Sequence, residues 1–281
     1  MKDSTSCRYR KNLLLNKVSL QIKLMFLALV CFAQLTLPAN ARDFDKVNIK
    51  VEKVAGQVYV LKGHGGNIGV LATDKGLVMI DSQFKPLAEK IDKAMKSIVD
   101  QEVKYIINTH FHGDHTGGNA EFAKHAPIFT YTDKVNIFFE GENIQLNHLP
   151  KGHTDGDTFV YFKEANVVHT GDLFFNGLFP FIDLNSGGTV TGYLDNVEYI
   201  ISNMPKDVII IPGHGEVTNI AGYQEFADMI KFSINKAQQA IKQGMSEADF
   251  VNAGIGEKYQ HLAWSFITEE KWLKTLYRGL K

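Results

Sequence analysis

Four side chains that can bind a metal ion occur within six consecutive residues, His110-Phe111-His112-Gly113-Asp114-His115. In an extended segment, His110 and His112 point to the same side, because successive side chains alternate. A turn of the chain at Gly113 then brings Asp114 and His115 to face a second point. Imidazole and carboxylate groups are common ligands of zinc and related metals. This segment alone therefore predicts ligands for two neighbouring metal ions.

Three more side chains of the same kinds follow at long intervals, and each has a glycine directly beside it. They are His153, Asp172 and His214. Glycine permits the close approach and the unusual backbone angles that a ligand-bearing loop needs. A single histidine is usually a solvated or packed residue, but packing does not explain this whole set. The chain therefore offers enough ligands for two zinc sites, with iron and manganese as alternatives.

Four short apolar runs in the sequence each end at a residue that can bind metal. They cover residues 76–80, 103–109, 166–171 and 208–213. The metal-capable residue at or near the end of each run is, in order, Asp81, His110, Asp172 and His214. Runs of this length that are rich in β-branched residues predict buried strands. Because α/β proteins commonly place their sites where strands end, the sequence predicts a site at one edge of a sheet.

The rest of the pattern predicts an α/β domain. A strand meander is expected over residues 47–54, 57–62 and 67–73, and a short hairpin between 126 and 150. Helices are expected over residues 87–99, 117–125, 192–203, 223–243 and 269–278. Strands that alternate with helices across two halves indicate a sheet-rich core covered by helices on both sides. No linker divides residues 42–281, so we expect one domain there.

The first 41 residues differ from the rest. A basic, polar stretch (1–23) precedes an apolar run (24–37), which Ala39-Asn40-Ala41 follows. This layout predicts a secretory signal peptide cut after Ala41, and therefore a periplasmic or secreted protein. The apolar run is shorter than the about 20 residues that span a bilayer, so we expect no stable membrane anchoring after removal. Both cysteines lie in this segment, so the mature domain, residues 42–281, has no thiol.

Composition and charge narrow the function classes. The chain is 44% hydrophobic and 22% charged, which excludes collagen-like and disordered proteins. Of its 30 Lys and Arg residues six lie in the first 41 positions, but only one of its 31 Asp and Glu residues does. The mature part is therefore acidic, which argues against non-specific binding of nucleic acid or anionic lipid.

The order of these motifs resembles that of the metallo-β-lactamase superfamily, in which HxHxDH precedes a distant His, an Asp and a final His. The resemblance implies a four-layer αββα sandwich with two Zn²⁺ per chain at one edge. It assigns His110, His112 and His153 to the first zinc and Asp114, His115 and His214 to the second. Asp172 resembles the carboxylate that bridges both metals in glyoxalase II-like members, and Asp81 resembles a residue that supports the loop without binding metal.

The resemblance implies a zinc hydrolase in which a hydroxide bridging the two metals attacks a carbonyl carbon. The small-molecule substrate would be a lactam, lactone, ester or thioester, with Asp114 orienting the hydroxide. β-Lactamase activity stays open, because Asp172 stands where dedicated β-lactamases carry Cys or Ser. The alternatives are a glyoxalase II-like thioester hydrolase and, from other classes, a non-catalytic metal-binding protein or a nucleic-acid-processing protein. The acidic mature part and the predicted export disfavour nucleic acid as a partner.

The sequence does not decide which residues line a substrate pocket beside the predicted metal site. Four phenylalanines after Asp172 either line an apolar pocket or pack their loop onto the sheet: Phe174, Phe175, Phe179 and Phe181. His64 lies in a glycine-rich segment that forms either a hairpin turn or a substrate contact. The remaining histidines have no ligand-like neighbours, so we expect His169 to be buried and hydrogen-bonded and His125, His148 and His261 to be surface or packing residues.

Overall fold

The computed structural model describes residues 43–124, 126–129 and 134–281. Within it, Phe44–Lys281 forms a compact unit. The predicted signal peptide, its cleavage after Ala41 and the expected surface residue His125 lie outside the described residues. None of the helices in the described ranges combines the length and the apolarity that a membrane span requires.

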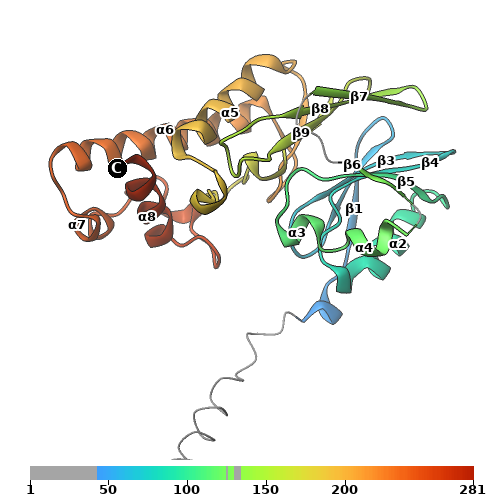
Figure 1. Cartoon of the computed structure of the whole chain (residues 1–281), viewed down its shortest axis with the longest axis horizontal. Coiled ribbons are helices and arrows are strands. Elements are labelled where there is room, and N and C mark those ends of the chain that lie inside the picture. Colours follow the sequence, from blue (N-terminus) through green and yellow to red (C-terminus); the bar gives the residue numbers. More distant parts are fainter. Residues whose placement is uncertain (1–42, 125, 130–133) are drawn as a thin grey trace, which may run out of the picture. The chain divides into compact units, whose positions relative to one another are not determined.

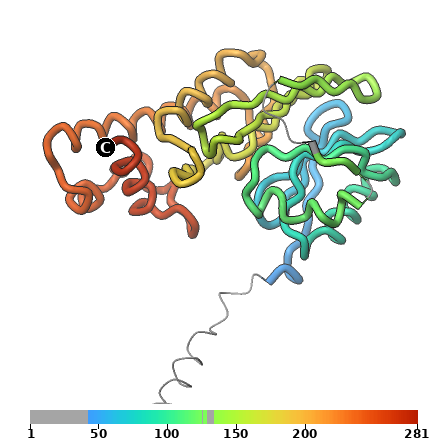
Figure 2. The backbone as a smooth tube through the Cα atoms, in the orientation of Figure 1, coloured from blue at the N-terminus to red at the C-terminus, as the bar shows by residue number. Residues whose placement is uncertain are grey.

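Two six-stranded sheets form the centre of this unit. The first has the order β1 (Lys50–Ala55), β2 (Val58–Lys62), β3 (Ile68–Thr73), β4 (Gly76–Ile80), β5 (Val103–Ile107) and β6 (Ile128–Phe129). The second has the order β12 (Thr218–Asn219), β11 (Ile209–Ile211), β10 (Val167–His169), β9 (Thr158–Phe162), β8 (Glu142–His148) and β7 (Lys134–Phe139). Only β4–β5, β5–β6 and β10–β11 pair in parallel; all other neighbours are antiparallel. The two sheets come from successive parts of the chain (Figure 2).

Helices connect and flank the strands (Figure 1). The α-helices are α2 (Ala88–Lys96), α3 (Gly113–Thr116), α4 (Asn119–Phe122), α5 (Val190–Asn203), α6 (Ile220–Lys242), α7 (Glu247–Asn252) and α8 (Glu269–Leu280). Short 3₁₀ turns are η2 (Phe44–Lys46), η3 (Lys85–Leu87), η4 (Gly171–Leu173), η5 (Leu184–Ser186) and η6 (Gln260–Leu262). The four helices from α5 onward each begin at a side chain that accepts a backbone N–H of the first turn, namely Thr189, Asn219, Ser246 and Thr268. Such caps stabilise helix starts by about 1 kcal/mol each.

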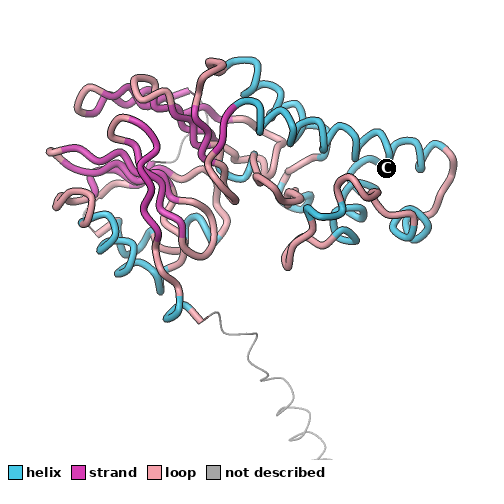
Figure 3. The backbone as a smooth tube through the Cα atoms, turned by 180° about the vertical axis from the view of Figure 1, so that it is seen from behind, coloured by secondary structure: helices cyan, strands magenta, loops and turns pink. Residues whose placement is uncertain are grey.

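Three apolar clusters show that these elements stack in four layers. Between the sheets, Val60, Leu71 and Ile80 of the first sheet share one cluster with Leu146 and Val160 of the second. The other face of the first sheet packs on α2, and the other face of the second packs on α5, α6 and α8. Figure 3 shows the helices on the outer sides of the two strand layers. The predicted αββα sandwich is therefore confirmed.

One predicted helix differs from the structure, and some described elements, among them α7 and β12, were not predicted. The strand meander, the 126–150 hairpin and four of the five helices occur at the expected places. Within the range 117–125 the described helix is only the short α4, which Gly117 and Gly118 separate from α3 before it. Strand β9 was not predicted, although Thr158–Phe162 is rich in aromatic and β-branched residues and all five are buried.

Candidate metal centre

All seven predicted ligands lie together at one edge of the two sheets. His110, His112, Asp114 and His115 follow β5, His153 lies between β8 and β9, Asp172 lies in η4 after β10, and His214 follows β11. They form two groups whose ligand atoms lie within 4.8 Å of one another: His110, His112, His153 and Asp172; and Asp114, His115 and His214. Residues up to a hundred positions apart therefore converge because their strands end at the same edge.

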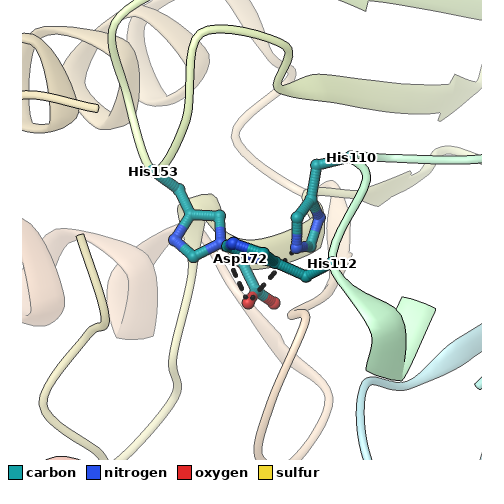
Figure 4. A group of neighbouring side chains, drawn as sticks. All are labelled: His110, His112, His153 and Asp172. Atoms are coloured by element: carbon teal, nitrogen blue, oxygen red, sulfur yellow. Dashed lines mark hydrogen bonds and ion pairs between the residues drawn. The ribbon is translucent and has the colours of Figure 1, made fainter. Parts of the chain in front are cut away.

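The first group is built from three imidazoles that face one carboxylate (Figure 4). His112 Nδ1 lies 2.8 Å from His153 Nε2. Asp172 Oδ2 lies 3.4 Å from His153 Nε2 and 3.7 Å from His110 Nε2. The ligand atoms thus surround a common point, which is the arrangement that a metal ion requires.

The second group lies on the other side of the same carboxylate. His115 Nε2 and His214 Nε2 lie 3.1 Å and 3.3 Å from Asp172 Oδ1. The same two nitrogens lie 3.7 Å and 3.4 Å from Asp114 Oδ2. Each oxygen of Asp172 therefore faces a different ligand group, which is the placement that a bridging carboxylate needs.

Three buried atoms of this centre lack a hydrogen-bond partner among the described residues: His110 Nε2, His115 Nε2 and Asp172 Oδ1. The latter two lie 3.1 Å apart but not in hydrogen-bonding geometry. Unpaired polar atoms in a protein interior cost about 1–3 kcal/mol each and call for an explanation. A cation at each group would satisfy all three, and imidazole nitrogens with carboxylate oxygens suit zinc. The residues present therefore fit a metal pair.

The charges of the centre are set by burial and by Asp172. Burial lowers the pKa of His110 well below its ordinary value, and the neighbouring His115 adds to this. Burial also lowers the pKa of His153 to about 4. Both imidazoles are therefore neutral near pH 7, which is the form that binds a metal.

The second group behaves in the opposite way. Burial would lower the pKa of His214, but the negative charge of Asp172 and a hydrogen bond with Asp114 raise it to about 9. The charges of Asp172 and Asp81 likewise raise the pKa of His115 well above its ordinary value despite burial. Burial would raise the pKa of Asp172, yet the surrounding histidines hold it well below its ordinary value. A metal that enters this group must therefore displace protons from the two imidazoles.

Asp81 holds one ligand without joining either group. Its backbone has a φ of 63°, an unusual conformation for this residue type. His115 Nδ1 donates to Asp81 Oδ2 at 2.6 Å, and the backbone N–H of Thr109 donates to Asp81 Oδ1 at 2.8 Å. With Nδ1 so engaged, the Nε2 atom of His115 is directed at the centre. This agrees with the supporting role that the resemblance assigns to Asp81.

Asp183 holds a ligand of the first group, His112, in the way that Asp81 holds His115. The sequence did not predict this role. His112 Nε2 donates to Asp183 Oδ2 at 3.1 Å, so that Nδ1 faces the other ligands. His153 Nδ1 donates to the carbonyl of Phe181 at 2.7 Å, two residues before Asp183. Asp183 also caps η5 by accepting the backbone N–H of Asn185. In the sequence, an Asp before Leu184-Asn185-Ser186 indicates a turn or cap and gives no sign of the contact with His112.

Two further residues that position the centre were also missed. Asn67 Nδ2 donates to the carbonyls of Pro212 and Gly215, on either side of His214, at 2.9 and 3.0 Å. The hydroxyl of Tyr193 in α5 donates to the carbonyl of Asp172 at 2.8 Å. Because these contacts join segments far apart in the chain, no local pattern predicts them.

The other histidines lie where expected, apart from His125, which is not described. His169 is buried: its Nε2 donates to the Asn67 carbonyl at 3.1 Å and its Nδ1 accepts the Gly171 N–H at 3.2 Å. His148 is half-buried and His261 is exposed. His64 is exposed, and its ring lies 5.8 Å from that of Phe44. Nothing in these contacts places His64 against the metal ligands.

Of the four phenylalanines after Asp172, three are buried in the core and one is partly exposed beside the metal ligands. Phe174, Phe175 and Phe179 are fully buried in the cluster under α5, α6 and α8, so packing is their role. The ring of Phe175 also stacks on that of His214 at 4.9 Å. Only Phe181 is half-exposed, and its ring lies 5.7 Å from that of His112.

The family model of the metallo-beta-lactamase superfamily matches residues 61–144 and 136–214, together more than half of the chain. The chain belongs to the metallo-β-lactamase superfamily. It is accordingly a metal-dependent hydrolase, and the matched region contains every residue of both ligand groups.

Individual relatives of this superfamily member are distant. The chain is 25% identical over 175 residues to a probable hydroxyacylglutathione hydrolase of Schizosaccharomyces pombe, covering 56% of this chain and 67% of that protein. It is 25% identical over 205 residues to metallo-beta-lactamase IND-1 of Chryseobacterium indologenes, covering 63% and 85%. The solved structure of the sec-alkylsulfatase Pisa1 from Pseudomonas sp. matches with a TM-score of 0.67 at 13% identity. That match covers 82% of this chain but only half of the sulfatase chain, and it shows the shared fold alone.

Proposed function

We propose that this protein hydrolyses a lactam, lactone, ester or thioester bond in a small molecule, with two bound Zn²⁺ ions. The observation that carries the proposal is the position of Asp172, whose two carboxylate oxygens face the two ligand groups. His110, His112 and His153 would hold one zinc, and Asp114, His115 and His214 the other. When bound, the zinc pair would polarise the carbonyl and lower the pKa of a water molecule to about 7.

Asp114 is the residue that we assign to proton transfer. Burial would raise its pKa, but the hydrogen bond with His214 and the nearby His115 outweigh this and lower it. Asp114 is therefore ionised at neutral pH and is ready to accept a proton of the attacking water. As the water oxygen bonds to the carbonyl carbon and the bond to the leaving group breaks, that proton passes to the leaving group.

A thioester is the alternative substrate that particular observations favour. The carboxylate Asp172, rather than a Cys or Ser, lies between the groups, as the resemblance to glyoxalase II-like members implies. The similarity to a probable hydroxyacylglutathione hydrolase supports the same alternative. The similarity to a metallo-beta-lactamase keeps lactams as candidates.

The test couples metal analysis of the purified protein to a substrate panel. The panel contains nitrocefin, lactoylglutathione, homoserine lactones and simple aryl esters, and Asp172→Ala serves as the matched control. We expect two zinc ions per chain and turnover of at least one substrate class that the control lacks. Two bound zinc ions without turnover of any panel member would contradict the proposal and favour a non-catalytic metal-binding role.

Export is a separate proposal that rests on residues 1–41 and not on the site. The basic stretch, apolar run and Ala39-Asn40-Ala41 support cleavage after Ala41. Amino-terminal sequencing of protein from a periplasmic fraction should begin at Arg42. Protein that stays in the cytoplasm with Met1 intact would contradict it.

A further inference from the structure

The segment after η6 lies beside the metal centre although it follows the last residue that the family model matches, His214. Two hydrogen bonds fasten it to the loop after Asp172. The indole Nε1 of Trp264 donates to the carbonyl of Phe179 at 2.9 Å, and the backbone N–H of Phe179 donates to the carbonyl of Leu262 at 2.9 Å. This part of the chain is therefore placed by specific contacts next to the ligands.

Aromatic side chains of this segment and of the loop after Asp172 lie next to the two ligand groups. The ring of Trp264 lies 6.0 Å from that of His214, and the ring of Phe181 lies 5.7 Å from that of His112. Phe266 lies 5.3 Å from Phe181 and 5.5 Å from Trp264. We call Phe111, Phe181, Trp264 and Phe266 the aromatic rim.

The rim exposes more apolar surface than packing requires. Phe266 is 51% exposed, and Phe111, whose ring lies 4.7 Å from that of His112, is 54% exposed. Large apolar side chains that cluster in the open beside a catalytic centre mark a binding surface. Aromatic faces there suit an apolar, and preferably aromatic, part of a small substrate.

Lys271, in the first turn of α8, adds a positive charge to this surface. Its Nζ atom lies 3.8 Å from the ring centre of Phe266 and 5.2 Å from that of Phe181. It donates one hydrogen bond, to the carbonyl of Phe266 at 3.2 Å. None of the carboxylates among the described residues forms an ion pair with it, whereas Lys274 on the same helix pairs with Glu270.

This arrangement leaves Lys271 short of a partner. An ammonium group has three donors, and the Phe266 carbonyl uses one of them. The side chain is partly buried against the aromatic rings, and this burial lowers the pKa of Lys271, while the remaining donors are free for an anionic group. The distance from Nζ to the His112 ring cannot exceed the sum of the two separations through Phe181, 5.2 and 5.7 Å, which a small molecule can span.

We propose that the aromatic rim and Lys271 bind the non-reacting part of the substrate, which carries an anionic group next to an apolar one. This inference rests on the proposed function, because the hydrolysed bond is taken to lie over the metal centre. The substrate class is thus narrowed to anionic amphiphilic carbonyl compounds. Lys271 contacts the anion, and Phe111, Trp264 and Phe266 contact the apolar group.

The test measures binding rather than turnover. The probes are 4-phenylbutane-1-sulfonate and 4-phenylbutan-1-ol, which share an apolar part, and the weakly basic sulfonate limits direct binding to zinc. Calorimetry on the zinc-loaded protein should show the sulfonate binding about tenfold more tightly than the alcohol. Lys271→Met should bring this ratio to about one. Lys274→Met, the matched control on the same helix, should leave it unchanged.

Further measurements keep the proposal falsifiable if Lys271→Met does not fold. High salt should reduce the preference of the unmodified protein for the sulfonate. Phe266→Ala should weaken both probes alike, by about tenfold. Equal affinity for the two probes, or a ratio that survives both Lys271→Met and high salt, overturns the inference.

The two proposals fail in distinguishable ways. A protein that turns over no panel member but prefers the sulfonate through Lys271 lacks the proposed function and keeps the rim as a binding site. A protein that hydrolyses panel substrates with no preference between the two probes keeps the proposed function and loses this inference.

Discussion

The metal centre and the aromatic rim are neighbours that are built in opposite ways. In the centre, the side chains are mostly buried and several ligands are held by a second contact, as Asp81 holds His115 and Asp183 holds His112. In the rim, Phe111 and Phe266 are about half-exposed, and Lys271 donates one hydrogen bond, to the Phe266 carbonyl. The centre also lies wholly within the region that the family model matches, whereas Trp264, Phe266 and Lys271 lie outside it.

The buried metal centre is suited to the reaction itself, and the exposed aromatic rim is suited to the choice of substrate. A reacting centre needs ligands that do not move, and rigid placement comes from burial and from satisfied hydrogen bonds. A binding surface needs only shape, apolar area and charge, which exposed side chains supply. Substitutions in the two regions should therefore change different measured quantities, and the following predictions test that division.

The largest effect is expected for Asp172→Ala. Without the carboxylate, each ligand group loses the oxygen that faces it. Zinc content should fall below two per chain, and kcat/KM should fall by about 10³-fold or more. Metal analysis after dialysis checks this, and full zinc content in the variant would refute the bridging assignment.

A loss of rate without a loss of metal is expected for Asp114→Asn. The amide keeps an oxygen ligand but cannot accept the proton of the attacking water. Most of the zinc should remain, while kcat should fall by about 10²–10⁴-fold. Steady-state kinetics combined with metal analysis measures both quantities. A variant as active as the parent would show that Asp114 does not transfer the proton.

Weaker metal binding is expected when a supporting carboxylate is changed. Asp183→Asn removes the negative charge and leaves one oxygen for the two groups that the carboxylate accepts from, His112 Nε2 and the Asn185 N–H, so zinc affinity there should fall by about 10–100-fold. Competition with a chelator measures this, and Asp155→Asn, an exposed carboxylate in the His153 loop, is the matched control. Equal zinc affinity in Asp183→Asn and the control would mean that Asp183 does not position His112.

A substitution in the aromatic rim should not change the zinc content of the protein. Phe111→Ala removes an exposed ring beside His112 without touching a ligand atom. We expect unchanged zinc content, a kcat within about twofold of the parent and a KM raised by about tenfold, since only substrate contact is lost. A kcat loss as large as that of Asp114→Asn would break the division between centre and rim.

The smallest effect concerns a pair of carboxylates at the opposite end of the β8–β9 hairpin from His153. Burial, with nearby Glu164 adding to it, raises the pKa of Glu142 to about 7. The folded state therefore holds a proton that the unfolded state releases near its ordinary pKa of 4.5, so stability falls as the pH rises from 4.5 through 7.

Glu164→Gln should reduce this loss, because Glu142 no longer faces a second carboxylate. The fall in Tm between pH 5 and pH 8 should be smaller than in the parent by about 2–4 °C, with activity unchanged. Thermal unfolding at several pH values checks this. An identical pH dependence in the two proteins would show that the pair does not contribute.

Local sequence carried much of the fold and the identity of the ligands. Short β-branched runs predicted the strands that precede Asp81, His110, Asp172 and His214, because burial imposes composition on each segment separately. The dense run from His110 to His115 predicted two metals for a similar reason, since its chemistry is contained in six neighbouring residues. Where local signals were mixed, as at Gly117 and Gly118, the predicted helix was longer than the one in the structure.

Tertiary structure alone decided which residues support those ligands and which aromatic side chains stay exposed beside them. Asn67 reaches His214 and Tyr193 reaches Asp172 across long stretches of chain, and neither has a local pattern. Likewise, the burial of Phe175 and the half-exposure of Phe181 follow from how the last helices pack on their loop. Such contacts depend on the summed packing of many segments, which composition and periodicity do not encode.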